Sequence, residues 1–193
     1  MKSRIKNSKK NTIFFGLFTI LLILLDQATK YLAKAVFMKE PFLLIPGVFE
    51  FRYLENQSAA FSMDPITLFQ RIFKLSYFTE HPESFLAWKM GFFYIFTIII
   101  TGLIIYLFLC IPTGKRYRAL NVIAALFVAG AIGNLIDRMV NHYVIDFLYF
   151  SLIQFPIFNV ADIYVTIAAV FFVIMGVFYY KEGDFARIFA KEV

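Results

Sequence analysis

The sequence predicts an all-α membrane protein with four transmembrane helices, a small extracytoplasmic β-rich platform and an outer loop. Of the 193 residues, 61% are hydrophobic and only 17% are charged, which is far too apolar for a soluble domain of this length. Four apolar stretches each approach the roughly 20 residues that a spanning helix needs. Lys and Arg gather in the segments between these stretches, as positively charged cytoplasmic loops do.

The apolar stretches fix the expected spans, and the residues between them fix the connections. We expect spans at about 13–36, 90–111, 119–137 and 160–180. The intervening segments are an outer platform and loop at about 37–89 and an outer loop at about 138–159. We treat residues 1–193 as a single integral membrane domain.

The basic residues predict the orientation. One group precedes the first span and a second fills the short connector between the second and third spans: Lys2, Arg4, Lys6, Lys9 and Lys10, then Lys115, Arg116 and Arg118. The positive-inside rule places both groups in the cytoplasm. With an even number of spans, both termini are then cytoplasmic and the two longer connections face outward.

The N-terminal region has features of a cleavable signal peptide, namely a basic start, the apolar run Ile13–Leu25 and the small-residue triplet Ala33-Lys34-Ala35. Asp26, Gln27 and Lys30 make the segment before the triplet long and charged. We therefore expect this region to remain in the protein as its first span.

The long outer connection predicts two kinds of structure. Residues Phe42–Tyr53 are rich in Phe, Leu, Ile and Val and are broken by Pro46 and Gly47, which indicates short strands within a platform at about 39–62. The segment Pro65–Pro82 combines basic and aromatic residues, which favours an amphipathic helix on the outer membrane face.

Several functional classes are excluded. The single cysteine, Cys110, excludes a disulfide framework and a Cys-rich metal site. The basic residues are not interleaved with aromatics on a soluble face, so we expect no nucleic-acid binding. The chain has no HExxH or Gly-x-Ser-x-Gly motif, and we expect His81 and His142 to be ordinary loop residues. We expect no cofactor.

Four carboxylates at or near span ends are the main functional signal. A carboxylate in a spanning helix costs a few kcal/mol or more and is therefore a functional candidate. On the expected topology they all lie toward the outer leaflet: Asp26, Asp137, Asp146 and Asp162.

Two of these acids also have structural explanations. Asp26 and Lys30 are four residues apart, so they can form an ion pair along one helix. Asn134 shares a helical face with Asp137 and Arg138, and Asp137 can simply hold Arg138 in position. For both acids the structural and the functional interpretations stay open.

Asp146 and Asp162 differ from the other two, because neither has a Lys or Arg within four positions. Asn159 lies three residues before Asp162 on the same helical face. Two carboxylates brought together in low dielectric cannot both ionise, so they share a proton. An aspartic protease needs this state, because one carboxylate takes a proton from water and the other donates one to the scissile carbonyl.

Composition and spacing leave two alternatives to a protease. A proton-coupled small membrane transporter also uses intramembrane carboxylates, although these sit at mid-membrane and the fold often carries an inverted repeat, which we do not find here. In a membrane adaptor, polar groups only join helices. The position of the acids at span ends argues against transport.

Five segments together resemble the bacterial lipoprotein signal peptidase family, also called signal peptidase II. In order along the chain they are Leu25-Asp26-Gln27-Ala28-Thr29-Lys30, Asn56-Gln57-Ser58-Ala59-Ala60-Phe61-Ser62, Gly133-Asn134-Leu135-Ile136-Asp137-Arg138, Val144-Ile145-Asp146-Phe147 and Phe158-Asn159-Val160-Ala161-Asp162. Each segment alone is a weak signal, but all five in order are highly specific.

The resemblance implies an aspartyl endopeptidase that removes the signal peptide from diacylglyceryl-modified prolipoproteins, cutting just before the lipidated Cys. Asp146 and Asp162 match its catalytic pair. Other family positions match residues that line or support the site: Asn56, Asn134, Arg138, Asn159, Asp26, Lys30 and Asp137. The resemblance further implies a bacterial cytoplasmic (inner) membrane location, an active site toward the outer face, contact with membrane lipid, inhibition by the cyclic peptide globomycin and no metal. We expect a monomer.

Two features depart from the family pattern. Ser58 stands where the family usually has Gly, so a backbone with positive φ would be strained there. The segment Met63–Trp88 is longer than expected between this motif and the second span, and we expect an outer-face lid or a partner surface.

Overall fold

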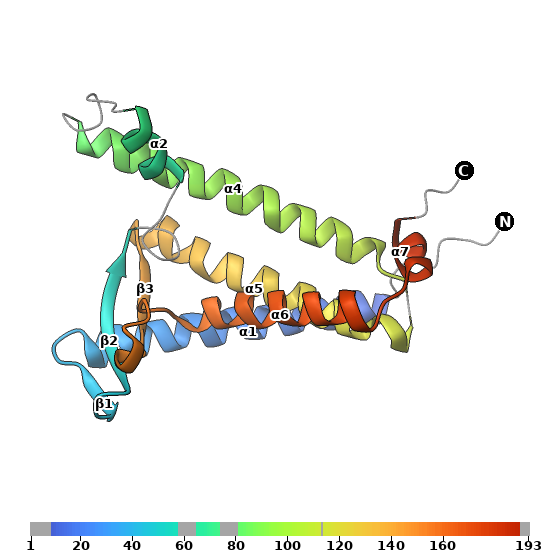
Figure 1. The fold of residues 1–193 in the computed structure, drawn as a ribbon, viewed down its shortest axis with the longest axis horizontal. Coiled ribbons are helices and arrows are strands. Elements are labelled where there is room, and N and C mark those ends of the chain that lie inside the picture. Colours follow the sequence, from blue (N-terminus) through green and yellow to red (C-terminus); the bar gives the residue numbers. More distant parts are fainter. Residues whose placement is uncertain (1–8, 58–64, 74–80, 113, 190–193) are drawn as a thin grey trace. The chain divides into compact units, whose positions relative to one another are not determined.

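Four long helices dominate the structure, a computed structural model that describes residues 9–57, 65–73, 81–112 and 114–189 (Figure 1). All four are long and apolar enough to cross a membrane: 11–37, 82–110, 115–141 and 160–178. A small three-stranded sheet accompanies them. The predicted fold class, an all-α membrane protein with four transmembrane helices and a β-rich platform, is confirmed.

Three of the helices begin earlier than the predicted spans, and the last ends at residue 178 rather than at about 180. They are α1 (Lys9–Phe37), α4 (Pro82–Cys110), α5 (Arg118–Asn141, after the 3-10 turn η2, Lys115–Tyr117) and α6 (Val160–Phe178). Helix α4 begins before the predicted residue 90, because Pro82 suits a first helical position and Glu83 is favourable in the first turn. Helix α5 continues past residue 137 and stops where His142 adopts a left-handed φ of 64°.

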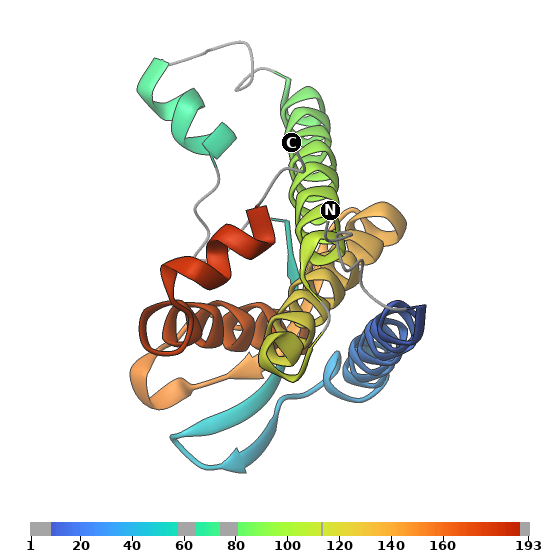
Figure 2. The ribbon, with the colours of Figure 1, turned by 90° about the vertical axis from the view of Figure 1, so that its right-hand side faces the viewer.

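The predicted platform contains a hairpin of β1 (Phe42–Ile45) and β2 (Phe49–Asn56), joined by a turn in which Gly47 has a φ of 73°. A third strand, β3 (Val144–Tyr149), pairs antiparallel with β2 and gives the order β1-β2-β3, visible in Figure 2. This strand corrects the prediction of an outer loop over about 138–159. The short 3-10 turn η3 (Ser151–Ile153) follows it.

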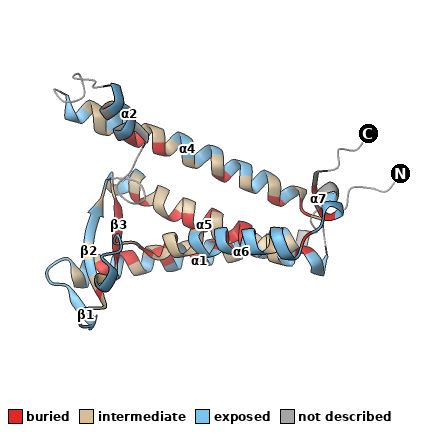
Figure 3. Ribbon diagram, viewed as in Figure 1, coloured by how far each residue is buried: buried red, intermediate tan, exposed pale blue. Residues whose placement is uncertain are grey.

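The register of β2 and β3 places polar side chains on one face of the sheet. Leu54 is opposite Asp146 and Asn56 is opposite Val144, so Asn56 and Asp146 are diagonal neighbours that point to the same side. Strand β3 is buried along almost its whole length, whereas all four residues of β1 are exposed (Figure 3). Leu148 also exchanges backbone hydrogen bonds with Phe158, which fixes the chain just before α6.

The predicted amphipathic helix at Pro65–Pro82 is described only in part. Helix α2 covers Pro65–Phe73, and its side chains Leu68, Phe69, Ile72 and Phe73 are exposed. Residues 74–80 lie outside the described part of the chain, and so does Ser58, together with the rest of the platform beyond residue 57.

The chain forms two compact units. The first contains residues 1–26, 100–132 and 160–193, and the second contains residues 27–99 and 133–159. In the first unit an apolar core surrounds Phe108, which stacks on Phe15 at 3.8 Å between ring centroids. The C-terminal helix α7 (Glu182–Phe189) turns across the end of α6 in this unit and adds Ile188 to the core (Figure 1). The second unit contains the sheet and most of the polar residues considered below.

Candidate active site

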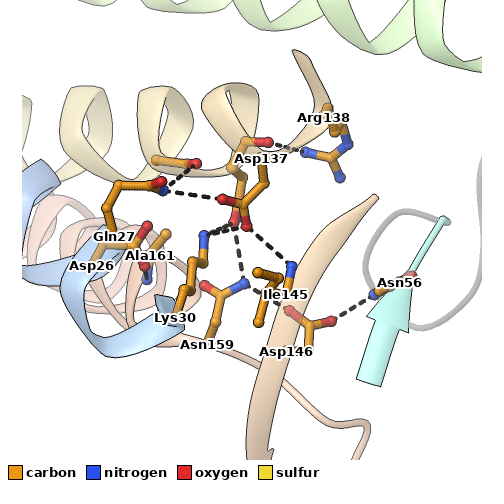
Figure 4. A network of polar contacts seen from close by, with 12 residues as sticks. Asp26, Gln27, Lys30, Asn56, Asp137, Arg138, Ile145, Asp146, Asn159 and Ala161 are labelled. Carbon is orange, nitrogen blue, oxygen red and sulfur yellow. Dashed lines mark hydrogen bonds and ion pairs between the residues drawn. The ribbon is translucent and has the colours of Figure 1, made fainter. Parts of the chain in front are cut away.

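Asp146 is the centre of a polar network in the second unit (Figure 4). Its side chain is 2% exposed on β3, and each carboxylate oxygen accepts a hydrogen bond from an asparagine amide. The Nδ2 atom of Asn159 lies 2.7 Å from Oδ1, and the Nδ2 atom of Asn56 lies 2.7 Å from Oδ2. Hydrogen bonds donated to both oxygens compensate the burial of the charge.

Asn134 connects this carboxylate site to Lys30 of α1. The Lys30 ammonium donates to Oδ1 of Asn134 at 2.9 Å, and Asn159 donates to the same oxygen at 3.1 Å. Lys30 is 1% exposed and Asn159 is 0% exposed, so these contacts are shielded from solvent. Lys30 is thereby connected to Asp146 through Asn134 and Asn159.

Asp137 forms a buried ion pair with Lys30, with 3.0 Å between Oδ2 and Nζ. The same Oδ2 accepts the backbone N–H of Ile145 at 3.0 Å, and Oδ1 accepts from Gln27 Nε2 at 3.1 Å. The described partners of Asp137 are thus Lys30, Gln27 and the backbone of Ile145. The suggestion that Asp137 also holds Arg138 in position stays a prediction.

Arg138 is held by other groups. Its guanidinium lies over the Phe93 ring, 4.7 Å from the centroid, and donates to the backbone carbonyl of Asn134 at 3.3 Å. The backbone carbonyl of Arg138 accepts from the Tyr94 hydroxyl at 2.9 Å. A half-buried guanidinium supported on an aromatic ring is a preorganised donor for a carbonyl or an anion.

Asp26 of α1 and Asp162 of α6 belong to the first unit. Oδ1 of Asp26 accepts the backbone N–H of Ala161 at 2.8 Å, which satisfies one of the unpaired donors of the first helical turn. Asp162 follows in that turn and is half-buried. The suggested ion pair between Asp26 and Lys30 stays a prediction.

The structure thus brings together six of the predicted site residues in the second unit: Lys30, Asn56, Asn134, Asp137, Asp146 and Asn159. Sequence reasoning missed Gln27 as a contributor, although it stands within the first motif beside Asp26. Its Nε2 also donates to the backbone carbonyl of Gly133 at 3.1 Å and so joins α1 to α5.

A second residue missed from the sequence is Gly130 of α5, in the first unit. A Cβ atom at this position would lie 2.6 Å from the carbonyl oxygen of Ala161 and 2.6 Å from a methyl group of Val165. Only glycine allows this close approach of α5 to the start of α6. The small residues at 129–131 of the sequence were the available signal.

The four apolar helices define a multi-pass membrane protein, and its second unit contains a buried network of acids, amides and a lysine. In the part of the chain that the structure describes, no three His, Cys, Asp or Glu side chains are close enough to hold a metal ion. The family model described as Signal peptidase (SPase) II matches residues 18–178. The chain belongs to the signal peptidase II family, and it is therefore a protease.

Individual relatives support this assignment over almost the whole chain. It is 32% identical over 174 residues to the lipoprotein signal peptidases of Streptococcus pyogenes serotype M5 (strain Manfredo) and serotype M18 (strain MGAS8232), covering 90% of this chain and 97% of each relative. Two solved bacterial membrane enzymes, determined by the in meso method at 2.3 and 1.9 Å resolution, have similar folds. Their TM-scores are 0.64 and 0.65, with 29% and 28% identity, covering 93% and 91% of this chain and 94% and 99% of theirs.

Proposed function

We propose that this protein is an aspartyl endopeptidase that removes signal peptides from diacylglyceryl-modified prolipoproteins and cuts just before the lipidated Cys. The observation that carries the proposal is the buried Asp146 carboxylate, held by two amide donors at 2.7 Å each in a member of the signal peptidase II family. A buried acid surrounded by directed donors is typical of a catalytic group.

Asp162 is the proposed second member of the catalytic pair. It lies three residues beyond Asn159, whose amide donates to Asp146. This short connection along the sequence supports the proposed pairing of the two carboxyl groups.

The proposed reaction adds water across the scissile amide bond. The ionised carboxylate of the pair takes a proton from water, and the water oxygen attacks the carbonyl carbon while the protonated carboxyl donates to the carbonyl oxygen. When the tetrahedral intermediate collapses, the C–N bond breaks and the leaving amine takes the proton from the first acid. The second acid recovers its proton from the intermediate's hydroxyl group, so both carboxyls return to their starting states.

The remaining site residues have binding and supporting roles in this proposal. Asn56, Asn134, Asn159 and Arg138 supply donors and acceptors to a substrate backbone in a place where water is scarce. The Arg138 guanidinium can face the developing oxyanion or a lipid ester carbonyl. Other polar residues support this arrangement from behind: Asp26, Lys30 and Asp137.

The proposal includes a cellular setting. The enzyme is proposed to lie in the inner membrane of a bacterium with its acids toward the outer face, and the basic segments before the first span and between the second and third support a cytoplasmic location of both termini. The enzyme works as a monomer on lipidated precursors in contact with membrane lipid, without a metal or other cofactor. Globomycin, a cyclic peptide, competes with the substrate.

A reconstituted cleavage assay tests the proposal. The purified protein is mixed in lipid with a diacylglyceryl-modified prolipoprotein, and the masses of the released signal peptide and of the mature product are measured by mass spectrometry. We expect a mature product that begins with the lipidated Cys. Metal chelators and serine- or thiol-directed reagents should leave the rate unchanged, and globomycin should inhibit it.

The controls separate the proposal from its alternatives. Inhibition by a chelator that added Zn²⁺ reverses would contradict a reaction carried by two carboxyl groups and water. A proton-coupled transporter would release no product, and proteoliposomes would instead show proton flux that depends on a solute gradient.

A further inference from the structure

We propose that Lys30 orients a chain of two asparagines that keeps Asp146 as the proton acceptor of the catalytic pair and leaves Asp162 as the proton donor. This inference rests on the proposed function and adds to it the assignment of the two acids. All residues of this hydrogen-bonded series, from Lys30 to Asp146, lie within the second unit. Figure 4 labels Lys30, Asn159 and Asp146.

The first link fixes the orientation of Asn134. The Lys30 ammonium has three N–H donors and no acceptor, and it lies 2.9 Å from the terminal side-chain atom of Asn134. That atom must therefore be the carbonyl oxygen. The ion pair with Asp137, at 3.0 Å, keeps Lys30 charged and in place.

The second link fixes the orientation of Asn159. One of its terminal atoms lies 3.1 Å from the Asn134 oxygen, so that atom must be the amide nitrogen. The same nitrogen lies 2.7 Å from Oδ1 of Asp146 and presents its second hydrogen there. Oδ1 must then accept a hydrogen bond and cannot carry a proton directed at Asn159.

The other oxygen of Asp146 faces a second amide nitrogen, that of Asn56, at 2.7 Å. Donors on both oxygens favour the ionised carboxylate. Asp146, Lys30 and Asn159 are each at most 2% exposed, so the donor on Oδ1 is shielded from water. The orientation is thus transmitted through neutral amides from a buried cation to a buried acid.

The elements that carry these residues also hold other charged and titratable groups. The full set is Lys9, Lys10, Asp26, Lys30, Tyr31 and Lys34 on α1, Glu50, Arg52, Tyr53 and Glu55 on β2, Arg118, Asp137 and Arg138 on α5, Tyr143 after it, Asp146 and Tyr149 on β3, and Asp162 and Tyr164 on α6. On β2, Arg52 donates to Glu50 and Tyr53 donates to Glu55, and Lys34 donates to Tyr143. Lys30 is the cation whose hydrogen bonds lead, through Asn134 and Asn159, to Asp146.

The assignment gives each acid one task. Ionised Asp146 takes the proton from water as the water oxygen bonds to the carbonyl carbon, and protonated Asp162 transfers its proton to the carbonyl oxygen. When the C–N bond breaks, Asp146 passes its proton to the amine. The proton on the hydroxyl of the intermediate returns to Asp162 as the new carboxyl group forms.

The test compares the pH dependence of kcat/KM in two near-isosteric variants. Asn134→Leu removes the oxygen that orients Asn159, so the acidic limb of the profile should move to higher pH by on the order of one unit. Gln27→Met removes contacts to Asp137 and Gly133 but leaves the chain intact. It should lower the rate at every pH without moving the limb. A limb that stays fixed in Asn134→Leu, or moves equally in both variants, overturns the proposal.

A second measurement does not depend on turnover, so it can also be made on an inactive variant. Infrared titration follows the carboxyl C=O stretch of Asp146, assigned by its absence in Asp146→Asn. The double variant Lys30→Gln/Asp137→Asn removes both charges together and leaves no uncompensated buried ion. Its Asp146 band should also titrate at higher pH than in wild type, and an unchanged titration in this variant contradicts the inference.

The same measurements distinguish this inference from the proposed function. If Asp146→Asn retains full cleavage, the catalytic pair itself is wrong. If Asp146→Asn is inactive while the titration of Asp146 is insensitive to Lys30 and Asn134, the pair stands and only the orienting chain is rejected.

Discussion

At the scale of single residues, Asp137 joins the sheet to the helices. Its carboxylate holds Lys30 of α1, Gln27 of the same helix and the backbone N–H of Ile145, the residue directly before Asp146. A displacement of Asp137 therefore moves the strand that carries the proposed catalytic acid. Positioning of this kind matters because a shift of about 1 Å at a reacting group can cost on the order of 10²-fold in rate.

The buried ion pair gives a first prediction. Lys30→Gln leaves the Asp137 carboxylate without its ammonium, so the protein should lose on the order of 3–5 kcal/mol of stability. The double variant Lys30→Gln/Asp137→Asn should melt at a higher temperature than Lys30→Gln, because neither charge remains. Thermal unfolding in detergent measures both. A double variant that melts at or below the temperature of Lys30→Gln would contradict this coupling.

The motifs predicted which residues form the site but not all of their contacts. A spacing of four within one helix suggested that Lys30 pairs with Asp26, yet its pairing with Asp137 joins residues 107 positions apart, which no local pattern reveals. The contacts of Gln27 could not be predicted for the same reason, because its partners Gly133 and Asp137 lie on another helix. Pairing between helices depends on packing, and packing is not encoded in local spacing.

At the scale of elements, β3 shows where pattern reading failed. The run Val144–Tyr149 contains β-branched and aromatic residues, but it lies between two predicted spans, within the segment at about 138–159 that we predict to be an outer loop. Its partner β2 lies about 90 residues away, and the contact of Asn56 with Asp146 spans 90 positions. The four spans, by contrast, were predictable because each depends only on a local run of apolar residues.

The close approach of α5 to α6 gives a prediction at this scale. Gly130→Ala places a methyl group 2.6 Å from the Ala161 carbonyl, so α6 must shift, with a cost of about 1–3 kcal/mol. Because Asp162 follows Ala161, cleavage should fall as well. The matched control is Gly102→Ala in α4, where a Cβ meets nothing within 4 Å and alanine should be neutral or stabilising. Equal melting temperatures and rates for the two variants would contradict this account.

Helix α7 gives a second prediction for an element. Two hydrogen bonds from Arg116, at 2.7 and 2.6 Å, lower the pKa of Asp184, assisted by the Lys181 N–H and the Tyr117 hydroxyl. With a lowered folded-state pKa, this stabilisation is complete above the ordinary carboxyl pKa of about 3.9 and is lost as the pH falls through the lowered value. Docking of α7 should therefore be constant from neutral to mildly acidic pH.

Limited proteolysis measures the docking of α7. Asp184→Asn should speed tryptic cleavage after Lys181 at neutral pH, because the amide cannot replace the paired carboxylate. Glu40→Gln, an exposed position in the connection after α1, should cleave like wild type. Identical cleavage rates for all three proteins would show that the Arg116–Asp184 pair does not hold the helix.

At the scale of the whole molecule, the proposed enzyme depends on the membrane to position its substrate. A diacylglyceryl group keeps its chains in the bilayer at about 0.8 kcal/mol per buried methylene, which fixes the depth of the attached Cys. A precursor without the lipid is free to move along the membrane normal. It should be cut on the order of 10²-fold more slowly at equal concentration, as measured in proteoliposomes. Comparable rates for both precursors would contradict this positioning role of the lipid.

The central claim is that two carboxyl groups, Asp146 and Asp162, carry the cleavage of a lipidated precursor. The most direct measurement is turnover of one purified prolipoprotein by wild type, Asp146→Asn, Asp162→Asn and the exposed control Glu182→Gln, each checked for normal accumulation and melting temperature. An amide can neither take up nor release the required proton, so we expect no product from either Asp variant and wild-type turnover from the control. Near-normal turnover by either folded Asp variant would contradict the claim.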